Sequence, residues 1–233
     1  MDLGAVQAAP VAVLVAGTVA AARNAQDLLH DAEVLAEAGR SARAHSLAAL
    51  AIEEVGKAGS LATLAAMPEN VRAQAPLGRM LEWHQLKLVG GRLIAAVPFA
   101  SVPFAPPVLG TKLATTPVTE LAQLLDNARA SAEELDRIKQ RGLYVDVDQT
   151  GQVREPSELS AARMHEQLGR AQQAVSSATP LLAPEAPPRI ARPGPESVEY
   201  SRAVVSAFAD AGPSRTPEAA AEALLNAIAK LQG

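Results

Sequence analysis

The chain has 233 residues, of which 48% are hydrophobic and 3% aromatic, and its formal net charge at pH 7 is −4. This length and apolar content suit one domain, alone or with an appendage, while the absence of cysteine excludes disulfides, thiolate metal sites and cysteine nucleophiles. The negative net charge does not indicate the basic surface of a nucleic-acid-binding protein, so an RNA substrate would have to bind a local patch of positive charge.

The N-terminal region contains an apolar run, "APVAVLVAGTVAAA", which lies within residues 8–22 and ends at Arg23. The run is shorter than the roughly 20 residues of a membrane-spanning helix. No basic region precedes it, as a signal peptide would require. We therefore predict a buried helix in a cytoplasmic protein, since the lack of cysteine fits a reducing compartment. A membrane-associated segment is the alternative.

Helical periodicity then dominates the first hundred residues. We predict helices over Val11–Ala38, with Gly39 as the C-cap, and over Ser41–Ala66, which Pro68 brings to an end. A third helix is expected over Val71–Ala96. Because alanine is abundant and aromatics are scarce, helices are favoured over sheets throughout.

The middle of the chain departs from this pattern. Residues 97–118 form a Pro-rich apolar loop, which either covers the core or serves as a lid or partner surface. A fourth helix is expected over Thr119–Arg141, with Gly142 as its cap. Residues 143–148 alternate apolar and polar side chains, which predicts a short strand or extended arm, and "DQTG", which begins at Asp148, predicts a turn.

The last third begins with a fifth helix, which we expect to start at Ser157 as N-cap and to end near Ala178. Residues 180–195 hold six prolines and read as a linker. The predicted division is thus a helical domain over 1–179, a Pro-rich linker over 180–195 and a helical tail over 196–233.

The predicted second helix carries charges in its apolar middle. On a helical wheel Glu53, Glu54 and Lys57 fall on the stripe of the leucines. Both glutamates can reach Lys57, at i,i+4 and i,i+3. Because unpaired buried charges cost several kcal/mol each, these groups must face a cleft, meet another charged element or take part in chemistry. A salt-bridge cluster that fixes helix register or a dimer interface is the structural alternative.

The third predicted helix has a matching feature. In "LGRMLEWHQLKLVGGRL", His84 and Lys87 share the stripe of leucines and methionine, three residues apart. A histidine among lysines suits acid–base chemistry, and lysines suit phosphate. If the two helices face each other, Glu54, Lys57, His84 and Lys87 would meet in one place.

Three segments, in order, resemble the AbiV-type abortive infection proteins. They are "ARNAQDLLHDAEVLAEAGRSARAHSLAALAIEEVGKAGSL", with the EE-x-GKA hallmark, then "WHQLK", then "KQRGLYVDVDQTGQVREPSEL". Together they span roughly residues 20–178. The resemblance implies an all-α fold, namely a HEPN-like up-and-down helical bundle, here with a short extended arm around 143–148 and a C-terminal helical appendage.

The resemblance also implies a homodimer that acts in bacterial antiphage defence. Many HEPN proteins are metal-independent endoribonucleases, so the resemblance raises that activity as well. Their signature of Arg, four to six residues, then His is matched by Arg40 with His45 and by Arg79 with His84. Arg79 lies about 140° from His84 on a straight helix, which weakens that pair as a single site.

The resulting functional hypothesis is a toxin-like ribonuclease that blocks translation on infection, without metal or cofactor. His84 would be the acid–base, Lys57 and Lys87 would hold the phosphate, and Glu54 would orient them. The expected supporting residues are Glu53, Tyr144, Asp146 and Arg79. Tyr144 and Asp146 have a structural alternative, in which an arm packs on the bundle.

The alternative function is a binding protein with a phage or translation-machinery partner, and we do not expect a membrane partner.

Overall fold

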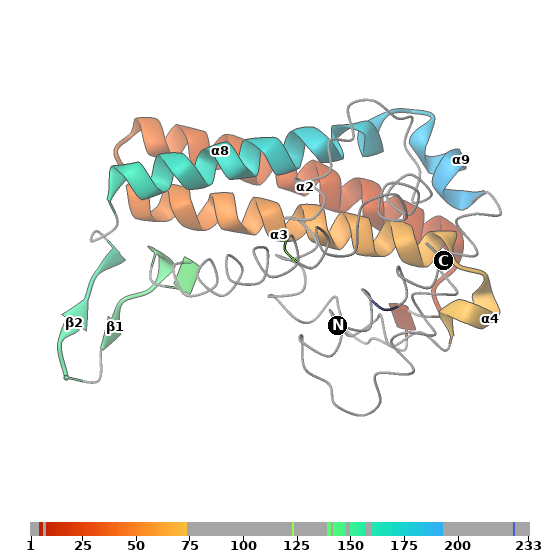
Figure 1. The fold of residues 1–233 in the computed structure, drawn as a ribbon, viewed down its shortest axis with the longest axis horizontal. Coiled ribbons are helices and arrows are strands. Elements are labelled where there is room, and N and C mark those ends of the chain that lie inside the picture. Colours follow the sequence, from red (N-terminus) through yellow and green to blue (C-terminus); the bar gives the residue numbers. More distant parts are fainter. Residues whose placement is uncertain are drawn as a thin grey trace.

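The computed structural model describes residues 5–6, 8–73, 123, 139–140, 142–147, 150–156, 160–192 and 226. Three long helices lie side by side (Figure 1): α2 over Val11–Glu37, α3 over Ser41–Ala66 and α8 over Ala161–Ala178. The described chain also forms five shorter elements. These are helices α4 (Glu69–Arg72) and α9 (Ala186–Ala191), the 3-10 helix η4 (Thr179–Leu182) and strands β1 (Asp146–Val147) and β2 (Val153–Arg154).

The core between the three long helices is built largely from alanine, with a few larger side chains. Leu14, Ile52, Leu64 and Met164 are almost completely buried. Small side chains let helix backbones approach closely, so α2, α3 and α8 can pack along much of their length (Figure 1). The all-α bundle expected from the sequence is confirmed. In the described parts of the chain, no helix is long and apolar enough to cross a membrane.

The first two helix predictions are confirmed closely. The turn after α2 has Gly39 at φ 71°, where the Gly39 N–H donates to the Ala36 carbonyl and the Arg40 N–H to the Leu35 carbonyl at 2.8 Å. This is the hydrogen-bond pattern of a Schellman C-cap, which favours glycine at the left-handed position. Helix α3 then covers the predicted range, Ser41–Ala66.

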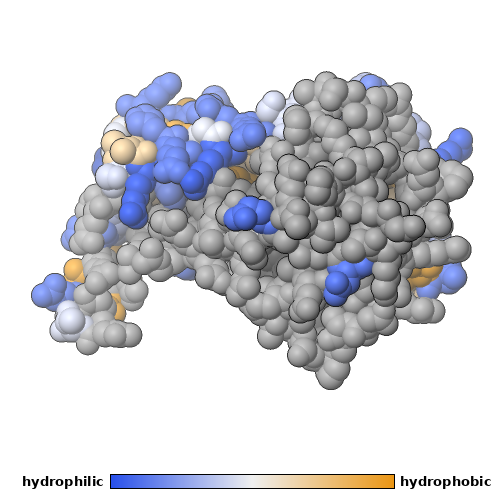
Figure 2. All heavy atoms as spheres, in the orientation of Figure 1, coloured by the Kyte–Doolittle hydropathy of each residue, from blue (hydrophilic) through white to orange (hydrophobic). Residues whose placement is uncertain are grey.

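The expected arm is an antiparallel hairpin that projects from one end of the bundle (Figure 1). Asp146 pairs with Arg154 and Val147 with Val153. The predicted turn is present, with Gly151 at φ 80°. Figure 2 shows apolar side chains on the surface of this hairpin.

Two predicted helix ends are wrong. Gly142 is helical rather than a left-handed cap, since the described residues with positive φ are Gly39 and Gly151. The fifth helix begins later than expected, because Ser160 rather than Ser157 is the N-cap of α8. The Ser160 side chain accepts a hydrogen bond from the backbone N–H of Arg163, so the second serine of "PSELS" satisfies the helix start.

The segment 180–195, expected to be a linker, is packed over its described part. Helices η4 and α9 both have proline at their first positions, where a missing N–H costs little. Leu181, Ala186 and Ile190 are buried in the same core as the long helices. Proline content indicated a linker, but the apolar residues between the prolines bury against the bundle.

The remaining predictions fall mostly outside the described residues. Helix α4 and Ala73 occupy the start of the predicted helix over 71–96, and the rest of that range is not described. The loop 97–118, most of the helix 119–141 and the tail 196–233, apart from Asn226, also lie outside. The extent of the helical domain and of the tail therefore stays a prediction.

Candidate functional site

The acidic pair in the middle of α3 divides into two separate ion pairs. Glu53 points into the protein, where its Oε1 accepts a hydrogen bond of 2.5 Å from Nζ of Lys139. The two side chains are 3% and 4% exposed. A carboxylate this deeply buried requires a partner charge. Glu53 therefore joins α3 to a residue 86 positions later in the chain.

Glu54 makes the second pair, with Lys57 at 2.5 Å one turn along the same helix. These side chains are 16% and 26% exposed, so the pair lies at the edge of the core and reaches solvent. The sequence suggested that both glutamates reach Lys57, but Glu53 is paired with Lys139 instead. Of the three charges on the leucine stripe, Glu54 and Lys57 are the ones placed where a ligand could meet them.

The segment that carries Lys139 is fixed to the first half of α3. The Ser46 hydroxyl is within hydrogen-bonding distance of the carbonyls of Ala42 and Lys139, at 3.1 Å each. At Gly142 a Cβ would lie 2.1 Å from Ser46 Oγ and 2.5 Å from the Ala42 carbonyl oxygen. Glycine is required here for close approach of two backbones. The base of the hairpin is thus held by an ion pair, a hydroxyl and a glycine contact.

Sequence analysis did not single out Lys139. The signal was present, because Lys139 opens the segment "KQRGLYVD" that carries part of the family resemblance. Its role depends on a contact across 86 residues, and helical periodicity gives no information about such a pairing.

The other predicted site residues divide between described and undescribed parts. His84, Lys87 and Arg79 lie outside the described residues, so the predicted meeting of Glu54, Lys57, His84 and Lys87 stays a prediction. Tyr144 is 61% exposed, at the start of the hairpin. Asp146 belongs to strand β1. In the described chain, no group of three or more histidine and acidic side chains is placed to hold a metal ion.

Arg40 and His45, the first pair that fits the Arg-to-His signature, do not lie on the same surface of the protein. Arg40 is exposed at the N-terminus of α3, whereas His45 is 3% exposed in the core. Five residues on a helix differ by about 140° in direction. Arg40 instead lines a pocket of about 550 Å³ between the α2–α3 turn and the segment that leads from β2 to α8. His45 is not among its lining residues.

Comparison with protein families gives a match. The HEPN_AbiV family model, described as AbiV, matches residues 13–176, which is well over half of the chain. This range includes most of α2 and α8, all of α3 and the hairpin. No curated protein and no solved structure matches.

Proposed function

Because the chain belongs to the AbiV family of HEPN proteins, we propose that it is an abortive-infection effector that cleaves RNA without a metal ion. The observation that carries this proposal is the position of the Glu54–Lys57 pair. The Glu54 and Lys57 side chains are 16% and 26% exposed, whereas most residues next to them in α3 are buried in the core. A charged pair that reaches solvent from such a helix can meet a ligand.

The chemistry assigned to this pair is phosphate binding. Lys57 would offer its ammonium group to the scissile phosphate and stabilise the negative charge that develops in the transition state. Glu54 holds that ammonium in place, at 2.5 Å. In a partly dehydrated site such an interaction is stronger than in bulk water.

The proton transfers are assigned to His84, with Lys87 as the second phosphate ligand. His84 would take the proton from a ribose 2′-hydroxyl or give one to the leaving oxygen, since imidazole changes charge near neutral pH. Attack by the 2′-hydroxyl on the adjacent phosphate breaks the bond between phosphorus and the 5′ oxygen of the next nucleotide. The products are a 2′,3′-cyclic phosphate and a strand whose 5′ oxygen takes up a proton to become a hydroxyl. Glu53, sealed with Lys139, is assigned a structural role rather than one in the reaction.

The experiment uses the purified full chain, total RNA and excess EDTA. We expect cleavage products with 2′,3′-cyclic phosphate ends, and a loss of at least about 100-fold in Lys57→Gln and His84→Ala. The matched control is Arg170→Gln, which removes a cation from the exposed Glu166–Arg170 pair on α8. A part-exposed pair contributes about 1 kcal/mol or less to stability, so Lys57→Gln should stay folded.

Two outcomes would contradict the proposed ribonuclease activity. One is cleavage that Lys57→Gln and His84→Ala leave unchanged, since this would place the activity elsewhere or in a contaminant. The other is protection against phage in cells by a wild-type protein that cleaves no RNA from infected cells. The second outcome would favour a binding protein.

A specific observation favours that second candidate. The hairpin and its base expose five large apolar side chains between 38% and 64%: Leu143, Tyr144, Val145, Val147 and Val153. A cluster of apolar side chains on a projecting element is typical of interaction surfaces. The partner would be a phage protein or part of the translation machinery.

A hairpin variant distinguishes the two candidates. Val145→Ser with Val147→Ser should abolish phage protection if the protein acts by binding, while Lys57→Gln should leave protection intact. If the protein is a ribonuclease, Lys57→Gln should abolish protection and the hairpin variant should leave it intact. The cytoplasmic location and the homodimer expected for this family are also proposals, and light scattering of the purified chain tests the dimer directly.

A further inference from the structure

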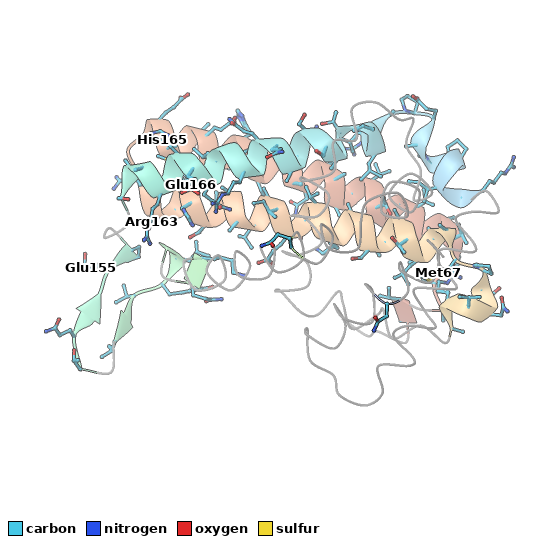
Figure 3. All side chains as sticks on the ribbon, viewed as in Figure 1. Met67, Glu155, Arg163, His165 and Glu166 are labelled. Carbon is cyan, nitrogen blue, oxygen red and sulfur yellow. The ribbon has the colours of Figure 1, made fainter. Side chains whose placement is uncertain are left out.

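The pocket beside the α2–α3 turn lies away from the Glu54–Lys57 pair and has its own chemistry. Its lining comes from the end of α2, the first turn of α3 and the segment that follows β2. Figure 3 labels Glu155, between β2 and the start of α8. The lining residues are Leu35, Gly39, Arg40, Ser41, Ala42, Arg43, Glu155 and Pro156. A volume of about 550 Å³ lies within the range of small-ligand sites.

Two cations line this pocket and have no ion-pair partner within the described part of the chain. Arg40 and Arg43 are exposed, and among the described residues neither makes an ion pair. They are three residues apart at the start of one helix, so their side chains share a face. Two guanidinium groups on one face repel each other mildly, and an anion bound between them relieves that repulsion.

The rest of the lining is mixed. Leu35 and Pro156 supply apolar surface, while Glu155 supplies a carboxylate that is exposed and unpaired within the described chain. Such a pocket matches a ligand with an anionic end, a flat apolar body and hydrogen-bond donors. A nucleotide has all three, in its phosphate, its base and its sugar hydroxyls.

We propose that this pocket binds a nucleotide by its phosphate, either a free nucleotide or the 5′ end of a nucleic-acid strand. Arg40 and Arg43 bind the phosphate by charge-assisted hydrogen bonds. Leu35 and Pro156 contact the base, and Glu155 accepts hydrogen bonds from the sugar or base. Helix α3 has no side-chain cap and no acidic residue in its first turn, which adds favourable N–H groups to the two arginines. The proposal is independent of the ribonuclease, since neither Glu54 nor Lys57 lines the pocket.

The test is titration calorimetry of the full chain with AMP, with adenosine as the ligand that lacks phosphate. We expect saturable binding of AMP with one site per chain and no saturable binding of adenosine. Arg40→Gln and Arg43→Gln should each weaken AMP binding by at least about tenfold. The matched control is Arg23→Gln, an exposed arginine on α2 that does not line the pocket.

A second titration separates the two sources of the phosphate. It uses a short 2′-deoxy oligonucleotide with and without a 5′-phosphate, which the proposed cleavage through a 2′-hydroxyl cannot consume. Tighter binding of the phosphorylated strand than of AMP identifies a strand end as the ligand. AMP binding at least as tightly identifies a free nucleotide.

Three results would overturn the proposal. They are the absence of saturable binding by both AMP and the phosphorylated strand, equal weakening in Arg23→Gln, and unchanged affinity in both pocket variants. Arg43→Gln keeps the test valid if Arg40→Gln disturbs the turn, because Arg40 is the N-cap residue of α3 and Arg43 lies beyond it. Circular dichroism of each variant verifies the fold.

Discussion

Glu53 and Lys139, 86 residues apart in the chain, form a buried ion pair with an Nζ–Oε1 distance of 2.5 Å. The next residue, Glu54, faces the solvent edge and pairs with Lys57. Two adjacent glutamates therefore serve different purposes. One holds the base of the hairpin against α3, and the other takes part in the candidate site.

The buried pair should show strong coupling between its members. We expect Lys139→Met and Glu53→Leu each to lower the free energy of unfolding by about 3–5 kcal/mol, because each removes one member of a buried ion pair. The double variant should be more stable than either single variant. Urea denaturation of the four proteins measures this, and additive single effects would contradict the pairing.

Gly142 should tolerate no side chain. Gly142→Ala places a Cβ 2.1 Å from Ser46 Oγ and 2.5 Å from a backbone oxygen of α3, so the hairpin base must move. We expect a loss of about 1–3 kcal/mol or more. The matched control is Gly169→Ala in α8, where nothing lies within 4 Å of the added Cβ.

That control should change stability in the opposite direction. Alanine in an open helix interior is favoured over glycine by about 0.5–1 kcal/mol. Thermal unfolding of the two variants should therefore shift in opposite directions. Equal and small shifts would show that Gly142 is not in close contact with α3.

Gly39 tests the turn between α2 and α3 in isolation from packing. A Cβ at Gly39 meets nothing within 4 Å, so the cost of Gly39→Ala comes from φ at 71° alone. We expect a loss of about 1 kcal/mol. Gly39→Asn should lose less, because asparagine tolerates the left-handed region. A stabilised alanine variant, measured by urea denaturation, would be incompatible with this turn.

The start of α8 gives a direct comparison of two serines. Ser160→Ala should lower stability by about 0.5–1 kcal/mol, since Ser160 accepts from the Arg163 N–H at a long 3.4 Å. Ser157→Ala should have a smaller effect if Ser160 alone caps the helix. The difference in urea midpoint between the two variants decides which serine is the cap.

Ile190 tests whether the Pro-rich segment belongs to the bundle. Its side chain is completely buried, so Ile190→Ala should lower the free energy of unfolding by about 2–5 kcal/mol. Val13→Ala, at a residue 57% exposed on α2, should change it by about 0.5 kcal/mol or less. If both variants behaved like Val13→Ala, the segment would be a linker after all.

The sequence by itself determined the elements whose signals are local. Hydrophobic periodicity, Gly39 and Pro68 placed both ends of α3 and the end of α2, because capping and helix termination depend on neighbouring residues. Alternation followed by "DQTG" predicted the arm and its turn for the same reason. The charges in the middle of α3 were predicted to face a cleft, to meet another charged element or to take part in chemistry, and the structure shows the second of these for Glu53.

Only the tertiary structure decided which partners those were. Lys139 is distant in the chain, so no local pattern could assign it to Glu53 and leave Lys57 to Glu54. Gly142 looked like a cap, yet its function is to let two backbones approach. The prolines after residue 179 looked like a linker, yet Ile190 is buried. Each depends on contacts between distant segments, which form only when the whole chain packs.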